Sequence, residues 1–302
     1  MKIIKSGRRI KSSVLTLGNF DGVHLGHQQI LKKVRTRANM CGCPSIVYTF
    51  EPHPVKVVAP ERSLPLITTF DDKIELLSSF DIDFLVCADF TREFASRHPG
   101  EFVKNELLLR LGVKEVWVGH DYLFGRGKEG TVDYLKELGK EFNFKAGVIP
   151  AFKKGGGIVS SSRIRGLILN GDVKKASALL GWVFSISGKV IKGRNRGKEI
   201  GFPTANIYTL NELIPGRGVY AAYCRVKGKI LPAVVSIGTN PTFGDIDSVN
   251  IEAHVIDFNG NLYGKNLRIH FVKRIRDEIK FKNPDKLVSQ IKMDIKKARG
   301  LL

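Results

Sequence analysis

The chain has 302 residues, 43% of them hydrophobic and 26% charged, so it is long enough for two ordinary globular domains. No apolar run approaches the ~18 residues of a membrane span, and Val14–Leu17 is too short for a signal peptide, so we expect a cytoplasmic protein without a membrane partner. The net charge of +20 is divided as +9 on residues 1–183 and +11 on residues 184–302, which favours attraction of anionic small molecules over a nucleic-acid partner.

The first half of the chain alternates strand and helix signals. Apolar runs predict five strands, at Val14–Leu17, Ser45–Phe50, Asp83–Cys87, Val116–Gly119 and Ala146–Ile149. Amphipathic patterns predict helices between them, at Gln28–Asn39, Asp71–Phe80, Glu101–Leu111 and Val132–Phe142. This alternation predicts a Rossmann-like α/β domain, in which a parallel sheet carries helices on both faces.

The loops that follow these strands are expected to meet at one ligand-binding edge, because the carboxyl ends of parallel strands lie together. They are Gly18–His27, Glu51–Pro54, Gly119–Gly130 and Gly155–Arg165. Two further helices are predicted at Ser162–Asn170 and from Gly171 to Leu180. We interpret about 162–183 as a helical linker that ends the first domain.

The sequence changes character at Phe184, where β-branched residues and turns become frequent. Strands are predicted at Phe184–Ile191, Val219–Val226, Ile230–Ile237, Ile251–Phe258 and Leu267–Phe271. Asn259-Gly260 is a hairpin signal, and a last helix runs from Asn283-Pro284 to about Ala298. We therefore expect a small antiparallel β-barrel with a C-terminal helix, and domains at 1–183 and 184–302.

The loop Gly18–His27 has the composition of a phosphate site. Gly22 and Gly26 let the backbone approach phosphate oxygens, and a helix beginning near His27 adds oriented N–H groups. The imidazoles of His24 and His27 can stabilise charge that builds up during transfer at an α-phosphate, with pyrophosphate leaving. The alternative is that one histidine caps the helix and the other is exposed to solvent.

A second element at the same predicted edge is Ser160–Arg165, whose hydroxyls and guanidinium groups suit a triphosphate at a helix start. A serine run before arginine is also a common helix cap. Gly125–Gly130 matches G-x-G-x-x-G, but it follows the fourth predicted strand, where a dinucleotide fingerprint follows the first. We interpret it as a mobile phosphate loop that carries Arg126 and Lys128.

The second candidate site begins at Gly193–Lys198, which fails as a P-loop because Glu199 follows the lysine. Its glycines and cations can still cover a polyphosphate. Beyond Pro203, the side chains of Thr204 and Asn206 face the same side of an extended chain and offer hard ligands for Mg²⁺. The alternative there is a turn that Asn206 caps.

Glu252 lies within the apolar strand Val249–Val255, which is unusual for a carboxylate unless it faces a site. It can accept the proton of a primary hydroxyl as a phosphoryl group is transferred. The alternative is an ordinary outward-facing strand residue.

The N-terminal motifs resemble a known family. Gly18–His27 together with Ser160–Arg165 resembles the H-x-G-H nucleotidyltransferases, and most closely the adenylyltransferase domain of prokaryotic FAD synthetases. Phe50–Pro54 and Gly119–Gly125 resemble two further motifs of that domain, although the family often has Asn where Asp121 stands. The resemblance implies that His24, His27 and Arg165 are catalytic. It also implies ATP contacts at Gly18, Asn19, Phe20, Asp21, Gly26, Asp121, Arg126, Ser161 and Ser162.

The C-terminal motifs resemble riboflavin kinases. Gly201–Asn206 is similar to the signature of that family, and further motifs are Gly218–Tyr220, Ile237–Gly244, Glu252–His254 and Tyr263-Gly264. The resemblance implies that Glu252 is the catalytic base and that Thr204 and Asn206 hold Mg²⁺. It implies ATP contacts at Gly193, Gly197 and Lys198 (the family commonly has Arg at this last position), and flavin contacts at Arg276, Glu278 and Phe281.

Taken in chain order, the motifs resemble bifunctional riboflavin kinase/FAD synthetases. This implies that riboflavin and ATP give FMN in the C-terminal domain, and that FMN and a second ATP give FAD and pyrophosphate in the N-terminal domain. Two rivals stay open. One is another nucleotidyltransferase whose barrel only binds substrate, and the other is a non-enzymatic nucleic-acid-binding protein. The sequence indicates no oligomeric state.

Overall fold

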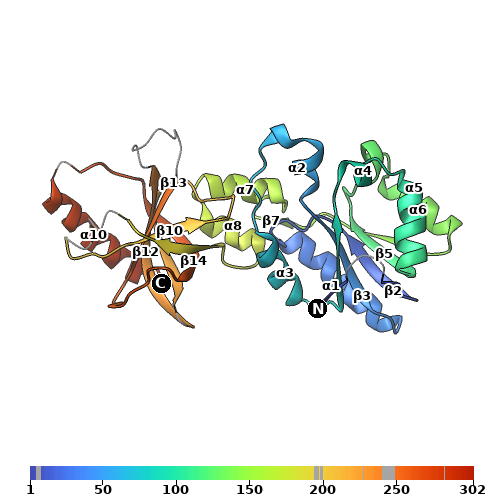
Figure 1. The fold of residues 1–302 in the computed structure, drawn as a ribbon, viewed down its shortest axis with the longest axis horizontal. Coiled ribbons are helices and arrows are strands. Elements are labelled where there is room, and N and C mark those ends of the chain that lie inside the picture. The colour runs from blue at the N-terminus through green and yellow to red at the C-terminus, as the bar shows by residue number, and fades with distance from the viewer. Residues whose placement is uncertain (5–7, 194–196, 198–199, 227, 240–248, 282) are drawn as a thin grey trace. The chain divides into compact units, whose positions relative to one another are not determined.

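The computed structural model describes residues 1–302 except 5–7, 194–196, 198–199, 227, 240–248 and 282. The chain divides into two compact units, Met1–Ser161 and Ser162–Leu302 (Figure 1). The first is an α/β unit and the second contains a closed β-barrel, so the predicted fold class is confirmed. The predicted domain limits, 1–183 and 184–302, stay a prediction.

The first unit is built on a six-stranded parallel sheet in the order β1-β4-β3-β2-β5-β6. Its strands are β1 (Lys2–Ile4), β2 (Ser13–Leu17), β3 (Ser45–Glu51), β4 (Phe84–Asp89), β5 (Val113–Gly119) and β6 (Lys145–Ile149). The prediction of five strands was one short, because β1 has only three residues in a basic segment and is defined by its pairing with β4. A small ribbon, β7 (Lys153–Lys154) with β8 (Gly157–Ile158), follows β6.

Helices cover both faces of this sheet, as predicted. On one face α1 (Leu25–Met40) and α3 (Phe70–Ser78) bury Ile30, Leu31 and Leu77. On the other, α5 (Pro99–Phe102) with its continuation η2 (Val103–Arg110) and α6 (Val132–Glu141) bury Leu107 and Leu135. Short helices fill the connections, at α2 (Pro54–Val58), η1 (Pro60–Arg62), α4 (Arg92–Ala95) and η3 (Arg126–Lys128).

Strand β2 marks the point where the strand order reverses. It pairs with β3 on one side and with β5 on the other, and the chain completes β3 and β4 before it returns to β5. Ligands of open parallel sheets bind outside the carboxyl ends of the strands at such a point. The loops after β2 and β5, Gly18–His27 and Gly119–Gly130, therefore flank the expected binding crevice.

The second unit begins with α7 (Ser161–Leu169), which starts at the boundary, and α8 (Val173–Leu180). Six antiparallel strands then close a barrel in the order β10-β13-β12-β11-β14-β9. They are β9 (Ser185–Ile191), β10 (Ala205–Thr209), β11 (Gly218–Val226), β12 (Lys229–Thr239), β13 (Val249–Val255) and β14 (Asn266–Arg276). The sequence predicted five of them. It missed β10, whose residues were interpreted only as a ligand motif.

The C-terminal helix α10 (Pro284–Arg299) is held to the barrel by charge as well as by packing. The side chain of Asn283 caps it by accepting a hydrogen bond from the Lys286 N–H at 3.0 Å. Asp294, which is 2% exposed, pairs with Arg276 of β14 at 2.8 Å. This pair fixes one face of the helix against the end of β14.

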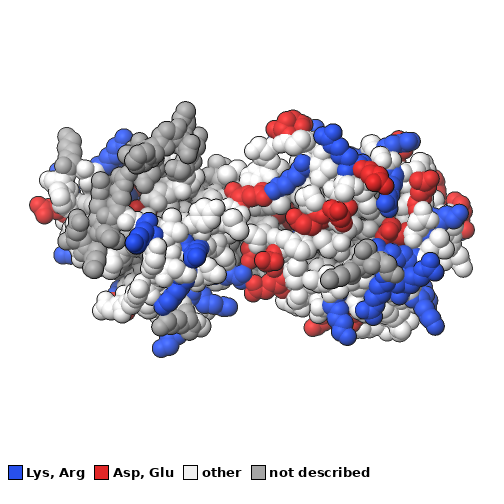
Figure 2. All heavy atoms as spheres, in the orientation of Figure 1, with Lys and Arg blue, Asp and Glu red and all other residues white. Residues whose placement is uncertain are grey.

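Charged side chains of both signs are visible on one face of the molecule. On the face drawn in Figure 2, Lys and Arg side chains lie on both units, and Asp and Glu are interspersed with them mainly on the first unit. Within the residues that the structure describes, no helix is long and apolar enough to cross a membrane.

Candidate functional site

The loop after β2 is held in a strained shape by its neighbours. The Gly18 N–H donates to the Tyr48 carbonyl at 3.1 Å, and the Thr49 hydroxyl donates to the Asn19 carbonyl at 3.3 Å. Phe20 and Val23 have φ values of +51° and +38°, in the left-handed region that a β-branched residue such as Val23 normally avoids. Such strain persists only where surrounding contacts enforce it, and it is concentrated at functional sites.

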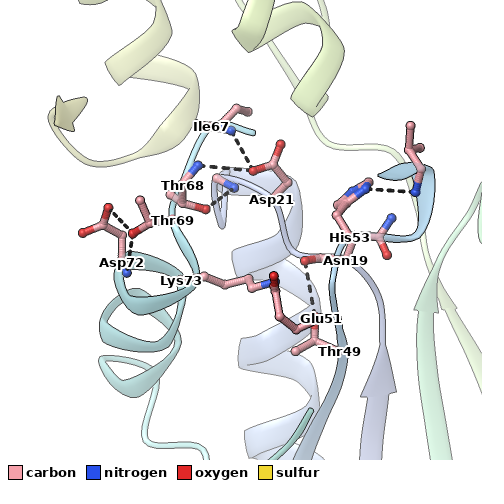
Figure 3. Close-up of polar contacts among 12 residues, drawn as sticks. Asn19, Asp21, Thr49, Glu51, His53, Ile67, Thr68, Thr69, Asp72 and Lys73 are labelled. Atoms are coloured by element: carbon pink, nitrogen blue, oxygen red, sulfur yellow. Dashed lines mark hydrogen bonds and ion pairs between the residues drawn. The ribbon is translucent and has the colours of Figure 1, made fainter. Parts of the chain in front are cut away.

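Asp21 supplies much of that enforcement. Its buried carboxylate accepts hydrogen bonds from the N–H groups of Ile67 at 2.9 Å and Thr68 at 3.3 Å (Figure 3). The Gly22 N–H donates to the Thr68 hydroxyl at 3.2 Å. The sequence assigned Asp21 to ATP, and the structure gives its carboxylate an internal bracing task.

His24 is the N-cap of α1, which starts at Leu25 and not at the predicted Gln28. Its Nδ1 accepts from the His27 N–H at 3.3 Å, so its Nε2 carries the ring proton and can donate outward. Gly26 leaves room for this ring, because a Cβ there would lie 3.1 Å from the His24 Cε1.

The two imidazoles form one stacked pair. Their centroids are 3.7 Å apart with an interplanar angle of 14°, and the His27 ring also packs edge-on against Phe20 at 5.1 Å. Burial lowers the pKa of His24 to about 4, and burial with the neighbouring His24 holds the pKa of His27 well below its usual value. The buried His27 Nδ1 has no hydrogen-bond partner among the described residues. His24 therefore caps the helix, as the alternative prediction stated for one of the two histidines. His27 is packed against Phe20 and His24 and is only partly exposed to solvent.

The segment Val159–Ser161 meets this loop. The Ser161 hydroxyl donates to the Asp21 carbonyl at 2.9 Å, at the start of α7. Ser162 and Arg165 belong to the second compact unit, and Arg165 is 8% exposed. Their position beside the histidines remains a prediction.

The loop after β5 contributes charge. Asp121 is exposed, its Oδ1 lies 3.7 Å from the His120 Nδ1, and its charge partly opposes the lowering of the His24 pKa. Arg126 is exposed and pairs with Glu129 at 3.4 Å. Gly125–Gly130 closes on itself through two backbone hydrogen bonds of 2.9 Å between Phe124 and Gly130, and α6 begins only at Val132. This is not the strand–turn–helix of a dinucleotide site.

The second site is assembled on the outer side of β10 and β13. Glu252 lies opposite Asn206 in the strand register, and the Thr204 hydroxyl donates to its Oε2 at 3.3 Å. The Asn250 side-chain amide donates to Oε1 at 2.8 Å. The structure thus brings together the three residues that the sequence selected, and it adds Asn250, which the sequence analysis missed.

Two predicted ATP contacts of this site lie directly against these residues. A Cβ on Gly193 would lie 1.9 Å from the Asn206 Nδ2, and one on Gly197 would lie 2.4 Å from the Phe202 carbonyl oxygen and 3.2 Å from the Thr204 Oγ1. At Gly197 the clash is with backbone, so that position requires glycine, whereas a side chain at Gly193 would have to displace the Asn206 amide. Lys198 is outside the described residues.

The donor atoms at this site suit a hard cation. The Thr204 hydroxyl, the Asn206 amide and the Glu252 carboxylate are oxygen donors, as Mg²⁺ prefers. In the described ranges of the chain there is no cluster of three or more His, Cys, Asp or Glu that could hold a metal. The residues present fit Mg²⁺ that takes its other ligands from nucleotide and water.

The predicted flavin contacts lie around the ends of β12, β14 and α10. The guanidinium carbon of Arg276 is 5.9 Å from the centroid of the Phe281 ring, and its nitrogens are bonded to Asp294. A Cβ on Gly238 would lie 2.2 Å from the Glu278 Oε1, so this carboxylate rests on the backbone of β12. Arg276 thus anchors the C-terminal helix, a task that the sequence did not reveal.

Comparison with known proteins covers nearly the whole chain. The FAD synthetase family model matches residues 7–163, and the riboflavin kinase family model matches residues 180–302. The bifunctional riboflavin kinase/FMN adenylyltransferase of Escherichia coli K12 is 35% identical, over 99% of this chain and 97% of its own. The chain belongs to this bifunctional family. The enzyme of the same name from Listeria monocytogenes is 36% identical over 96% of this chain and 92% of its own.

The family carries two transferase activities, a riboflavin kinase and an FMN adenylyltransferase, with ATP and flavins as the small-molecule substrates. The rival in which the barrel only binds substrate is therefore excluded. A crystal structure titled as a macrolide-efflux protein from Streptococcus pneumoniae matches with a TM-score of 0.88 and 32% identity, over 98% of this chain and 95% of that one. The efflux role in that name applies to the Streptococcus pneumoniae protein alone.

Proposed function

We propose that the kinase reaction takes place at Glu252, Thr204 and Asn206. The observation that carries this proposal is the meeting of the Glu252 carboxylate with the Thr204 hydroxyl at 3.3 Å and its register opposite Asn206. Thr204 and Asn206 hold Mg²⁺, which when bound neutralises charge on the phosphates of ATP. The segment from Gly193 to Lys198 covers the nucleotide, and Arg276, Glu278 and Phe281 line the flavin side.

In this reaction the riboflavin 5′-hydroxyl loses its proton to a carboxylate oxygen of Glu252 as its oxygen attacks the γ-phosphorus of ATP. The bond from that phosphorus to the β-phosphate oxygen breaks, and FMN and ADP result. The Asn250 amide and the Thr204 hydroxyl each bond one Glu252 oxygen, so they orient the base towards the hydroxyl.

The adenylyl transfer takes place at the Gly18–His27 loop. A phosphate oxygen of FMN attacks the α-phosphorus of a second ATP in line, the bond to the β-phosphate breaks, and FAD and pyrophosphate leave. The His24 Nε2–H and the His27 ring donate to the charged phosphate oxygens, and Ser161, Ser162 and Arg165 bind the departing phosphates. Gly18, Asn19, Phe20, Gly26, Asp121 and Arg126 shape the ATP site, and Asp21 acts through its brace.

The two reactions run in sequence, because the product of the C-terminal site is the substrate of the N-terminal site. Incubation of the protein with riboflavin, ATP and Mg²⁺, followed by chromatography, is expected to show FMN first and FAD later. Omission of Mg²⁺ with a chelator present is expected to stop FMN formation.

Two variants assign the reactions to their residues. Glu252→Gln is expected to slow FMN formation by about 100-fold or more while FAD still forms from added FMN. His27→Ala is expected to stop the reaction at FMN, with a loss of adenylyl transfer of about 100-fold or more. Normal FMN formation by Glu252→Gln, or normal FAD formation by His27→Ala, contradicts the corresponding assignment.

A further inference from the structure

A buried lysine lies at the substrate edge of the first unit and belongs to none of the motifs discussed so far. Lys73, in α3, is 6% exposed, and its Nζ lies 3.9 Å from the Glu51 Oε2 at the end of β3 (Figure 3). An ammonium group has three N–H donors, and among the described residues Lys73 makes no hydrogen bond with them. Its interactions are those of a point charge.

The cost of burying this charge indicates that the charge itself is needed. Moving an ammonium group out of water is expensive unless other charges compensate for it. Burial lowers the pKa of Lys73, and the carboxylates of Glu51 and Asp21 oppose that lowering. The Phe70 ring, whose centroid is 5.3 Å from the Nζ, adds a weaker attraction.

The start of α3 is tied to the Gly18–His27 loop, and this tie determines where Lys73 points. Asp21 accepts from the N–H groups of Ile67 and Thr68, which immediately precede the helix. Thr69 caps the helix by accepting from the Asp72 N–H at 3.2 Å. Lys73 stands one turn further on, so its side chain reaches the end of β3, where the Thr49 hydroxyl meets the Asn19 carbonyl (Figure 3).

Two carboxylates lie at the edge of the sheet where the anionic substrates are proposed to bind. Asp21 belongs to the loop after β2, and Glu51, whose side chain is 42% exposed, ends β3. FMN and ATP both carry several negative charges. Two like charges that lie within about 10 Å of each other repel appreciably where water is partly excluded. The Lys73 ammonium, 3.9 Å from the Glu51 Oε2 and also attracted by Asp21, reduces that repulsion.

We propose that Lys73 is a positioning residue of the adenylyl-transfer site: its ammonium offsets the charge of Glu51 and Asp21, so that two anionic substrates can bind side by side. The inference rests on the proposed function of the N-terminal unit and adds a residue to it. Lys73 touches no substrate. It acts through the two carboxylates.

The test compares steady-state FAD formation from FMN and ATP by Lys73→Met, Glu51→Gln and the double variant. Lys73→Met is expected to raise the KM for both FMN and ATP by about tenfold, with a smaller change in kcat. Glu51→Gln alone is expected to leave both KM values equal to or lower than those of the wild type. In the double variant, Glu51→Gln is expected to reverse most of the rise in KM that Lys73→Met causes. The Lys73→Met defect is expected to shrink in 0.5 M salt, because screening weakens the repulsion.

Controls separate charge from folding. Lys136→Met removes an exposed lysine of α6 that pairs with Asp133, and it is expected to leave both KM values unchanged. Lys73→Arg keeps the charge and is expected to lie closer to the wild type than Lys73→Met. FMN formation from riboflavin by the same preparations, together with Trp117 fluorescence, reports whether each unit is folded.

Three results overturn the inference. They are unchanged KM values in a folded Lys73→Met variant, a double variant no better than Lys73→Met, and KM values that rise in Glu51→Gln alone. The comparison of Glu51→Gln with the wild type keeps Lys73 in place, so it remains decisive if Lys73→Met does not fold. A wild-type protein that makes no FAD from FMN refutes the proposed function of this unit, which is a separate outcome.

Discussion

The stacked histidines show how burial sets the chemistry of single residues. A histidine in water has a pKa near 6.5, but burial moves the pKa of His24 to about 4 and holds that of His27 well below its usual value. Both rings are therefore neutral around pH 7, and in the adenylyl transfer proposed above they would donate N–H groups to phosphate.

This pKa shift can be measured directly. In an NMR titration of the free protein, the ring protons of His24 are expected to stay constant from pH 8 to about 5.5 and to move with a midpoint near pH 4. His24→Gln identifies the signal by its disappearance. A midpoint near 6.5 would mean that the ring is solvated, contrary to the packing described above.

The same shift couples stability to pH. Because the folded pKa of His24 lies below the unfolded value, the unfolded chain binds more protons between about pH 4 and 6.5. The stabilisation is complete above pH 6.5 and is lost as the pH falls towards 4. Urea unfolding of the N-terminal unit, followed by Trp117 fluorescence, is expected to show a smaller loss between pH 7 and 5 for His24→Gln than for the wild type.

Asn250 offers a residue-scale test of the kinase site. Its side-chain amide donates to the Glu252 Oε1 at 2.8 Å. Its removal in Asn250→Ala is expected to lower the kcat of FMN formation by about 5-fold, the value of roughly one net hydrogen bond, with little change in KM. FAD formation from FMN serves as the internal control, and an equal loss in both reactions would indicate a general folding defect.

At the scale of elements, the C-terminal helix depends on one buried ion pair. Asp294 and Arg276 have side-chain exposures of 3% and 16%, and their nitrogen–oxygen distance is 2.8 Å. Removing one partner of such a pair leaves the other charge buried and uncompensated. Asp294→Asn is therefore expected to lower the free energy of unfolding of the barrel unit by about 3 kcal/mol.

The chain contains a matched control for this change. Arg299 and Asp257 pair at 2.7 Å with side-chain exposures of 52% and 70%. Because solvent screens an exposed pair, Asp257→Asn is expected to cost less than about 1 kcal/mol. Denaturant unfolding followed by fluorescence of Trp182, which lies in the second unit, measures both, and equal losses would contradict a special role for the Arg276–Asp294 pair.

The elements that the sequence predicted well are those with a strong local pattern. Helix α10 was expected from Asn283 because a capping Asn, a Pro at the first turn and apolar residues at four-residue spacing all agree. Strands β1 and β10 were missed, since three and five residues carry little periodicity. Both are defined by their pairing with other strands, β1 by β4 and β10 by β9 and β13.

At the scale of the molecule, the chain divides into two compact units, and the two proposed reactions use different loops. We expect FMN released by one chain to serve as substrate for another. A mixture of Glu252→Gln and His27→Ala proteins is then expected to make FAD from riboflavin and ATP, although neither variant does so alone. Accumulation of FMN without FAD in the mixture would indicate transfer confined to one chain.

The sequence by itself determined the classes of the two units, the order of the two activities and the residues of the motifs. These are local properties, since a loop such as Gly18–His27 must hold its own glycines and histidines in a row. The tertiary structure decided what those residues do for one another. It showed that His24 caps α1 and stacks on His27, that Asp21 braces the loop, and that a buried lysine of α3 pairs with Glu51. Burial and long-range charge arise only when distant segments pack together, so no local pattern announces them.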